Sequence, residues 1–178
     1  MESERIKNQY EDSKELYKYL LEKKEISFAL YIDDVYKKVL VLSAASYFES
    51  KISELISEYA EKACGTDKRI VHLVKSKAVE RQYHTLFDWD RSNTNKFWKF
   101  FGEETKNDVR NKIQDDEQLQ EAEKSFLELG QQRNLLVHKN FAETDVNTTV
   151  EEIYNKYCKA CVFISLIETV LDPDYLKK

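Results

Sequence analysis

Proline, glycine and cysteine are all scarce in this chain of 178 residues, which holds one proline, three glycines and three cysteines. Because proline and glycine interrupt regular structure, their near absence favours long helices over a strand-and-turn architecture. Three unevenly spaced cysteines do not make a disulfide framework, which suits a reducing compartment. We therefore predict an all-α fold in a single domain over residues 1–178.

Long apolar runs and an excess of positive charge are missing as well. The longest apolar runs, at residues 39–42 and 161–164, are far shorter than the roughly 20 residues of a membrane span. The first five residues lack the basic and then apolar order of a signal peptide. The net charge of −5 excludes a broadly basic surface, so any nucleic-acid contact should be local. We expect a soluble, cytoplasmic protein without membrane contact.

The spacing of apolar residues predicts an antiparallel bundle of about five or more helices. The first helix runs from Ile6 to about Lys24. Residues 1–29 would be an N-terminal helix extension, and residues 30–171 the core bundle. The second helix begins near Asp33, whose charge suits a helix N-terminus, and ends at Gly65. Its predicted inward face consists of Val35, Val39, Leu42, Ala45, Ile52, Ile56 and Tyr59.

Capping residues predict the boundaries of the later helices. Their predicted caps are Thr66 or Asp67, Ser92, Asp115 or Asp116, and Thr148. Their predicted ends lie near Tyr83, at Gly102, near His138 and before Asp172. The predicted inward face of the helix that ends near His138 consists of Leu119, Ala122, Phe126, Leu129, Leu136 and Val137.

Arg133 and His138, at the end of that helix, are the one place where the sequence suggests chemistry. Arginine keeps its charge while histidine titrates near neutrality, so the pair suits holding a phosphate and moving protons without a metal. An ideal helix turns about 500° over five residues, so the two side chains would point about 140° apart. They converge on one ligand only if the helix frays near His138 or if a second subunit supplies half of the site.

Two more residues bear on this site. Glu49 falls within the apolar face of the second helix, where a carboxylate either reaches water at the edge of the face or pairs with a cation. The candidate partner is Arg133, which lies on the inward face of its own helix. Gly130, one turn earlier, permits close backbone approach, which would suit a helix crossing at a dimer axis.

Residues 67–112 form the basic part of the chain, whereas residues 113–152 are strongly acidic. Trp89, Phe97 and Trp98 lie among the cations, so this segment is compatible with a phosphate-tracking groove with stacking platforms. Aromatic residues at helical spacing are more often core, and charges between them are more often a solvated face. The candidate RNA-contacting residues are Arg91, Lys96, Lys99 and Lys139.

Cys158 and Cys161 lie one helical turn apart. A zinc site needs two more ligands, and no histidine or further cysteine is placed to join them, so we interpret both as packing residues. We expect neither a metal nor a cofactor.

The R-x(4)-H motif at residues 133–138, with the polar Asn134 directly after the arginine, resembles the HEPN superfamily. Residues 43–52, which include Glu49, resemble the acidic-residue-bearing helix of the HEPN subgroup named for its association with RiboL-PSP proteins. The aromatic segment at residues 93–102 fits that subgroup less specifically. The resemblance covers about residues 30–171.

The resemblance implies a metal-independent endoribonuclease acting as a symmetric dimer, frequently in toxin–antitoxin or antiphage systems with a partner protein. His138 would act as general base or acid, Arg133 would stabilise the charged phosphorane, and Asn134 would orient the phosphate or His138. The expected products are a 2′,3′-cyclic phosphate and a 5′-hydroxyl, and DNA would not be cut.

The sequence departs from one HEPN subgroup after the motif, and two functions other than RNA cleavage are compatible with it. A subgroup partnered with nucleotidyltransferase antitoxins carries R-x(4)-H-x-Y, whereas here Phe141 follows Lys139 and Asn140, so silencing by modification of that tyrosine is not supported. The first alternative is a non-catalytic scaffold for RNA or a protein, which the acidic surroundings favour. The second is a structural dimerisation module with a buried pair of Arg133 and Glu49.

Overall fold

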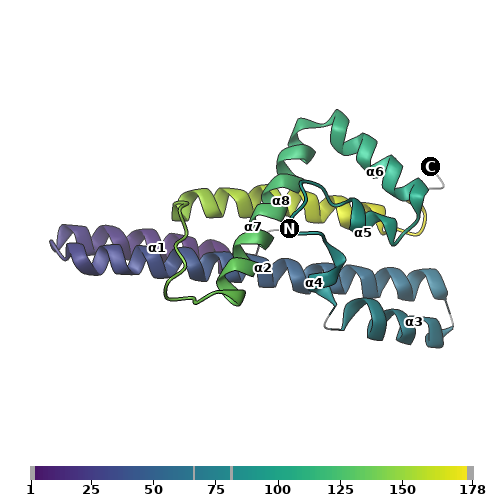
Figure 1. The fold of residues 1–178 in the computed structure, drawn as a ribbon, viewed down its shortest axis with the longest axis horizontal. Coiled ribbons are helices and arrows are strands. Elements are labelled where there is room, and N and C mark those ends of the chain that lie inside the picture. The colour runs from purple at the N-terminus through teal and green to yellow at the C-terminus, as the bar shows by residue number, and fades with distance from the viewer. Residues whose placement is uncertain (1–2, 66, 81, 176–178) are drawn as a thin grey trace.

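The computed structural model describes residues 3–65, 67–80 and 82–175 (Figure 1). These residues form eight α-helices and one π-helical segment and contain no strand, which confirms the all-α class. None of the helices within these ranges is long and apolar enough to cross a membrane. The elements are α1 (Glu4–Glu22), α2 (Ile26–Cys64), α3 (Lys68–Val74), η1 (Lys75–Val79), α4 (Tyr83–Leu86), α5 (Asn95–Lys99), α6 (Glu103–Asp115), α7 (Glu117–His138) and α8 (Val150–Val170).

Helix α2 is the axis of the molecule. It has 39 residues, which at the α-helical rise makes it about 58 Å long. Figure 1 shows α1 alongside one part of α2, α8 alongside its middle and α3 alongside its other end, while α7 crosses it. The crossing brings the middle of α2 against α7, and this contact positions the candidate site.

The start of α2 was predicted wrongly. The helix begins at Ile26 rather than at Asp33. Asp33 pairs with Lys37 at 2.5 Å and Asp34 pairs with Lys38 at 2.7 Å, in both cases one turn later. Acidic residues at this spacing stabilise a helix interior as readily as a helix start, and their charge alone does not distinguish the two positions.

The inward face of α2 also differs in part from the prediction. Ala45, Ile52 and Ile56 are buried as predicted. Val35, Val39, Leu42 and Tyr59 are only half-buried. Because α1, α7 and α8 all pack on α2, its buried surface is wider than one apolar stripe. The buried residues that the prediction missed include Leu40, Val41, Ala44 and Phe48.

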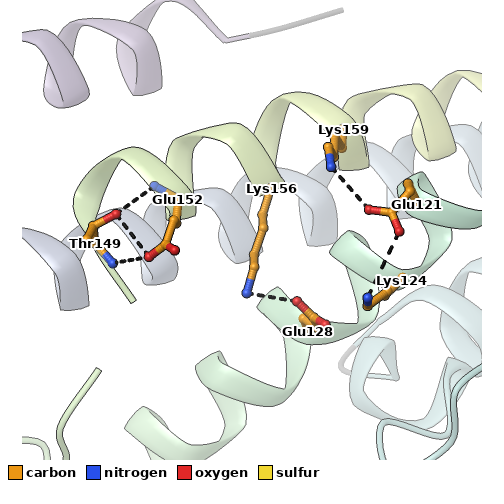
Figure 2. Close-up of polar contacts among 7 residues, drawn as sticks. All are labelled: Glu121, Lys124, Glu128, Thr149, Glu152, Lys156 and Lys159. Atoms are coloured by element: carbon orange, nitrogen blue, oxygen red, sulfur yellow. Dashed lines mark hydrogen bonds and ion pairs between the residues drawn. The ribbon is translucent and has the colours of Figure 1, made fainter. Parts of the chain in front are cut away.

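Ion pairs join α7 to α8 along their polar edges (Figure 2). Lys156 lies 2.8 Å from Glu128, and Lys159 lies 3.1 Å from Glu121. Lys159 holds the pKa of the Glu121 carboxyl below its usual value, first by its hydrogen bond and then by its charge. Both pairs are partly exposed, so solvent screens them and each contributes little to stability.

Helix α8 begins one residue later than predicted. Thr149, not Thr148, is the N-cap residue. Its hydroxyl accepts a hydrogen bond from the backbone of Glu152 at 3.1 Å, and its own backbone N–H donates to the Glu152 carboxylate at 2.7 Å (Figure 2). This is a complete capping box. Two adjacent threonines, each followed three residues later by a glutamate, made the two starts indistinguishable in the sequence.

Residues 67–116 contain the largest differences. Asp67 caps α3 as predicted, and Thr66 lies outside the described residues. The helix predicted to reach Tyr83 gives way to the π-helical η1 after Val74. Thr94, not Ser92, occupies the N-cap position of α5. Helix α6 was not predicted, because its apolar residues are few among many charges, whereas Asp116 caps α7 as expected.

Candidate active site

Arg133 contacts Glu49 across the crossing of α7 and α2. Its Nη2 lies 3.8 Å from Glu49 Oε2, which confirms the predicted pairing. The two side chains are 27% and 42% exposed, so the pair is not the buried one of the structural alternative. An ion pair in this position adds little to stability, on the order of 0–1 kcal/mol. At 3.8 Å the contact is longer than a hydrogen bond, so the Glu49 charge attracts the guanidinium without fixing its position.

Asn134 provides a second contact to the same guanidinium. The Nη1 of Arg133 donates to Asn134 Oδ1 at 3.2 Å. A guanidinium has five N–H donors, and these two contacts engage only part of them. The remaining donors are suited to an anion such as a phosphate, which an arginine binds through its planar fork.

Arg133 and Asn134 open onto a narrow recess between α7, α2 and the segment that holds α4. Its volume is about 10 Å³, room for roughly one water molecule. The recess therefore has room for about one non-hydrogen atom and excludes a base or sugar. Its other lining residues are Ala45, Phe48, Tyr83, His84, Trp89, Phe126 and Gly130.

Tyr83 and His84 were not predicted as site residues. Burial raises the pKa of the Tyr83 hydroxyl far above its usual value, the Glu49 charge raises it further, and the Arg133 charge opposes them. The hydroxyl therefore stays protonated, as a neutral group beside the ion pair. His84 is exposed and is also among the residues that line the recess. Neither residue has a motif spacing to Arg133, so the sequence carried no signal for them.

Gly130 is packed under Trp89 of the same chain. A Cβ atom at Gly130 would lie 2.0 Å from Trp89 Cζ3, so only glycine fits there. The Trp89 indole N–H donates to the backbone carbonyl of His84 at 3.2 Å, which fixes the ring over α7. The close approach predicted at Gly130 is correct, but its interpretation as a helix crossing at a dimer axis is wrong, because an indole fills the space.

His138 lies apart from the recess, at the last residue of α7. The helix remains regular there, since the N–H of Lys139 still donates to the carbonyl of Leu135 at 3.0 Å. The ideal separation of about 140° between Arg133 and His138 therefore applies, and fraying does not bring them together. Val137 is 51% exposed rather than inward-facing, and Leu135 is 46% exposed.

The sequence model of the RiboL-PSP-HEPN family matches residues 7–172, which include the whole of α2 through α8. The chain belongs to this family. No curated protein and no solved structure shows a significant match to the chain.

The candidate RNA contacts of this RiboL-PSP-HEPN chain lie in different places. Arg91 lines a second, larger groove of about 620 Å³. Lys96, Lys99 and Lys139 are exposed and lie outside both the recess and the groove. Lys99 pairs with Glu103 at 3.3 Å. These side chains remain candidates for contact with phosphates on the surface.

The aromatic residues of the basic segment belong mainly to the core. Phe97 is fully buried and Trp98 is 1% exposed, so neither offers a face for stacking with a base. Trp89 is half-buried and lies over Gly130. The core interpretation of these residues is therefore confirmed. Cys161 is also buried, and Cys158 is half-buried beside it on α8, as expected for packing residues.

Proposed function

We propose that this RiboL-PSP-HEPN domain is an endoribonuclease that needs no metal and cleaves RNA by attack of the ribose 2′-hydroxyl on the adjacent phosphate. The bond from phosphorus to the 5′-oxygen breaks, leaving a 2′,3′-cyclic phosphate and a 5′-hydroxyl. The observation that carries the proposal is the Arg133 guanidinium, which contacts Glu49 and Asn134 and belongs to a residue that lines a recess with room for about one water molecule.

Arg133 would stabilise the phosphorane. Charge accumulates on the non-bridging oxygens as the 2′-oxygen attacks, and a pre-oriented guanidinium stabilises that charge more than the charge of the ground state. Glu49 and Asn134 would be positioning residues, because the charge of Glu49 attracts the guanidinium and Asn134 accepts a hydrogen bond from it. The protonated Tyr83 hydroxyl beside the pair would add a neutral neighbour that does not compete with the phosphate for the guanidinium.

His138 would act from a second subunit. Its direction on α7 separates it from Arg133 of its own chain, so a shared site requires two copies related by a two-fold axis. One His138 would take the proton of the 2′-hydroxyl, and the other would protonate the leaving 5′-oxygen. The exposed Leu135 and Val137 beside His138 support a protein contact at this end of α7, because burial of apolar area favours association.

The non-catalytic scaffold is the second candidate function. The acidic composition of residues 113–152 favours it, since most of that surface would repel a polyanion. A role in a toxin–antitoxin or antiphage system, with a partner protein in the cytoplasm, is part of the same proposal and follows from the family likeness alone.

A cleavage assay tests the proposal. Wild type, Arg133→Ala and His138→Ala would be incubated with mixed RNA in the presence of a chelator, and the ends of the products identified by mass spectrometry. The matched controls are Arg69→Ala and His72→Ala, two exposed residues on α3 that line neither cavity. Cyclic-phosphate products that disappear in the two site variants and persist in the two controls support the enzyme. RNA that binds to the wild type without being cut would favour the scaffold.

A further inference from the structure

The groove that Arg91 lines has the size of a ligand site. Its volume of about 620 Å³ falls within the range of roughly 300–1,000 Å³ that is usual for small-molecule sites. The loop at residues 90–94 and helices α5, α6 and α7 form its walls. Nothing in the proposed cleavage step uses it.

A buried carboxylate lies at the wall of this groove. Glu123, only 8% exposed, accepts hydrogen bonds from the Thr94 backbone N–H at 2.7 Å and from the Thr94 hydroxyl at 2.6 Å. The same hydroxyl accepts from the Trp98 indole N–H at 2.8 Å. Within the described residues no basic side chain pairs with Glu123, although a buried carboxylate is costly without good partners. Its donors are neutral and fixed, which leaves acceptor capacity at a defined position.

Three cations also line the groove. Arg91, Arg110 and Lys124 are exposed and line it. Arg91 has a long contact of 3.5 Å to Asp88, and Lys124 has one of 4.0 Å to Glu121. Arg110 makes no ion pair with any residue that the structure describes. Such weakly engaged cations are available to a phosphate.

The remaining walls combine amide, acidic and apolar side chains. Asn93, Gln114 and Gln131 both donate and accept hydrogen bonds, while Ile113 and Leu127 offer apolar contact. The other carboxylates of the lining are Asp90 and Glu128, and Lys156 pairs with Glu128 at 2.8 Å. A ligand that matches these walls has an apolar ring face, a hydrogen-bonding edge and a negative charge. A nucleotide has all three.

We propose that the groove binds one ribonucleotide, with the base edge toward Glu123 and the phosphate toward Arg91 and Arg110. A carboxylate accepts from an exocyclic amino group, as on cytosine, and uracil presents carbonyl oxygens in that position. The groove therefore prefers bases with an amino group over uracil. This inference rests on the proposed function in that the nucleotide would be part of the RNA substrate.

The groove and the recess are joined through Trp89. Its backbone carbonyl accepts a hydrogen bond from the side chain of Gln131, which lines the groove, while its ring covers Gly130, which lines the recess. Gln131 and Arg133 are two positions apart on α7, which is about 3 Å along its axis but about 200° around it. The groove and the recess therefore lie on different faces of α7, with Trp89 in contact with both.

Fluorescence anisotropy with uncleavable 2′-O-methyl oligonucleotides of cytidine and of uridine tests this. In the wild type we expect tighter binding of the cytidine strand. Arg110→Ala should lower the affinity for both strands roughly three- to tenfold and reduce the slope of log affinity against log salt concentration by about one. Arg69→Ala should change neither the affinity nor the slope. Glu123→Gln keeps the size of the side chain and one oxygen that can accept the hydrogen bonds of Thr94. This variant should lose the preference for cytidine over uridine.

The outcomes separate the possibilities. An unchanged affinity and salt slope in Arg110→Ala would overturn the groove as the phosphate site, whether or not Glu123→Gln folds. An unchanged cytidine preference in a folded Glu123→Gln variant would overturn the role of the carboxylate. Binding of free CMP that Arg110→Ala abolishes, without strand binding, supports the nucleotide site and assigns it to free nucleotides. A wild type that binds as expected but cleaves no RNA would remove only the ribonuclease proposal.

Discussion

The recess at Arg133 and the groove at Glu123 both lie along α7, but they differ in size and in how their acidic residues are held. The recess has about 10 Å³, and Glu49, which pairs with Arg133 beside it, is half-exposed. The groove has about 620 Å³, and its Glu123 is buried and held by neutral donors. A small recess beside an arginine suits contact with a single reacting group, whereas a wide site with a fixed acceptor suits recognition of a whole nucleotide. The two cavities therefore have different roles in the proposed function.

The largest expected effect is on cleavage at His138. His138→Ala should lower the rate roughly 10²–10⁴-fold, the usual contribution of a positioned acid or base, while the affinity for uncleavable RNA changes little. The reason is that His138 lies outside both cavities and would act only on protons. Single-turnover cleavage and anisotropy measure the two quantities, and His72→Ala is the control. A variant that still cleaves at the wild-type rate contradicts the two-subunit mechanism.

The second-largest effect is expected from Arg133→Ala. The cleavage rate should fall roughly 10²–10³-fold, as for the loss of other oxyanion-stabilising donors. Arg133→Lys keeps the charge but loses the planar fork, so we expect it to recover only part of the rate. Both variants should leave the cytidine preference of the groove intact. Loss of that preference in either variant would show that recess and groove are one site rather than two.

Gly130→Ala tests the packing between the two cavities. The added Cβ would collide with the Trp89 ring, and overpacking of this kind costs about 1–3 kcal/mol of the free energy of unfolding. The better helix propensity of alanine offsets up to about 1 kcal/mol of that loss. Urea denaturation measures the difference.

The control for this prediction is a second substitution at Trp89. The loss from Gly130→Ala should be smaller in the background of Trp89→Ala, because the colliding ring is gone and the two residues are in contact. Equal losses in both backgrounds would mean that the ring does not limit residue 130.

His84→Ala should have a moderate effect on cleavage, roughly tenfold and below the usual range for a positioned acid or base. His84 lines the recess but is exposed, so water can replace part of its role. The pH–rate profile of this variant against that of His138→Ala shows which imidazole titrates in the reaction. If His84→Ala lowered the cleavage rate more than His138→Ala does, the proton transfer would be assigned to His84 at the recess instead of to His138 of a second subunit.

The smallest effect is expected at Lys96 and Lys99. Each lies outside both cavities, and exposed cations contribute a salt-dependent, sequence-independent part of RNA affinity. Alanine at either position should change the affinity about twofold at low salt and should not alter the cytidine preference. A change in that preference would extend the recognition site to α5 and weaken its restriction to the groove.

Local sequence patterns predicted the elements whose two ends carry strong signals. Asp116 and the end at His138 gave α7 correctly, and α8 differs only by the choice between Thr148 and Thr149. The pattern failed where neighbours override it. Asp33 lies inside α2, and α6 has too few apolar residues among its charges to stand out.

The sequence by itself determined the helical class, the family likeness and the Arg133, Asn134 and Glu49 cluster, because helical periodicity and one short motif encode them. Only the tertiary structure decided what surrounds that cluster. Tyr83, His84 and Trp89 reach it from a segment with no regular spacing to α7, and the groove forms where the loop before α5 and helices α5, α6 and α7 fold against one another. Contacts of this kind depend on the path of the chain between helices, which local patterns do not specify. The direction of His138 was predictable from helix geometry, and the end of α7 is unfrayed, which is why the proposed mechanism brings His138 to Arg133 from a second subunit.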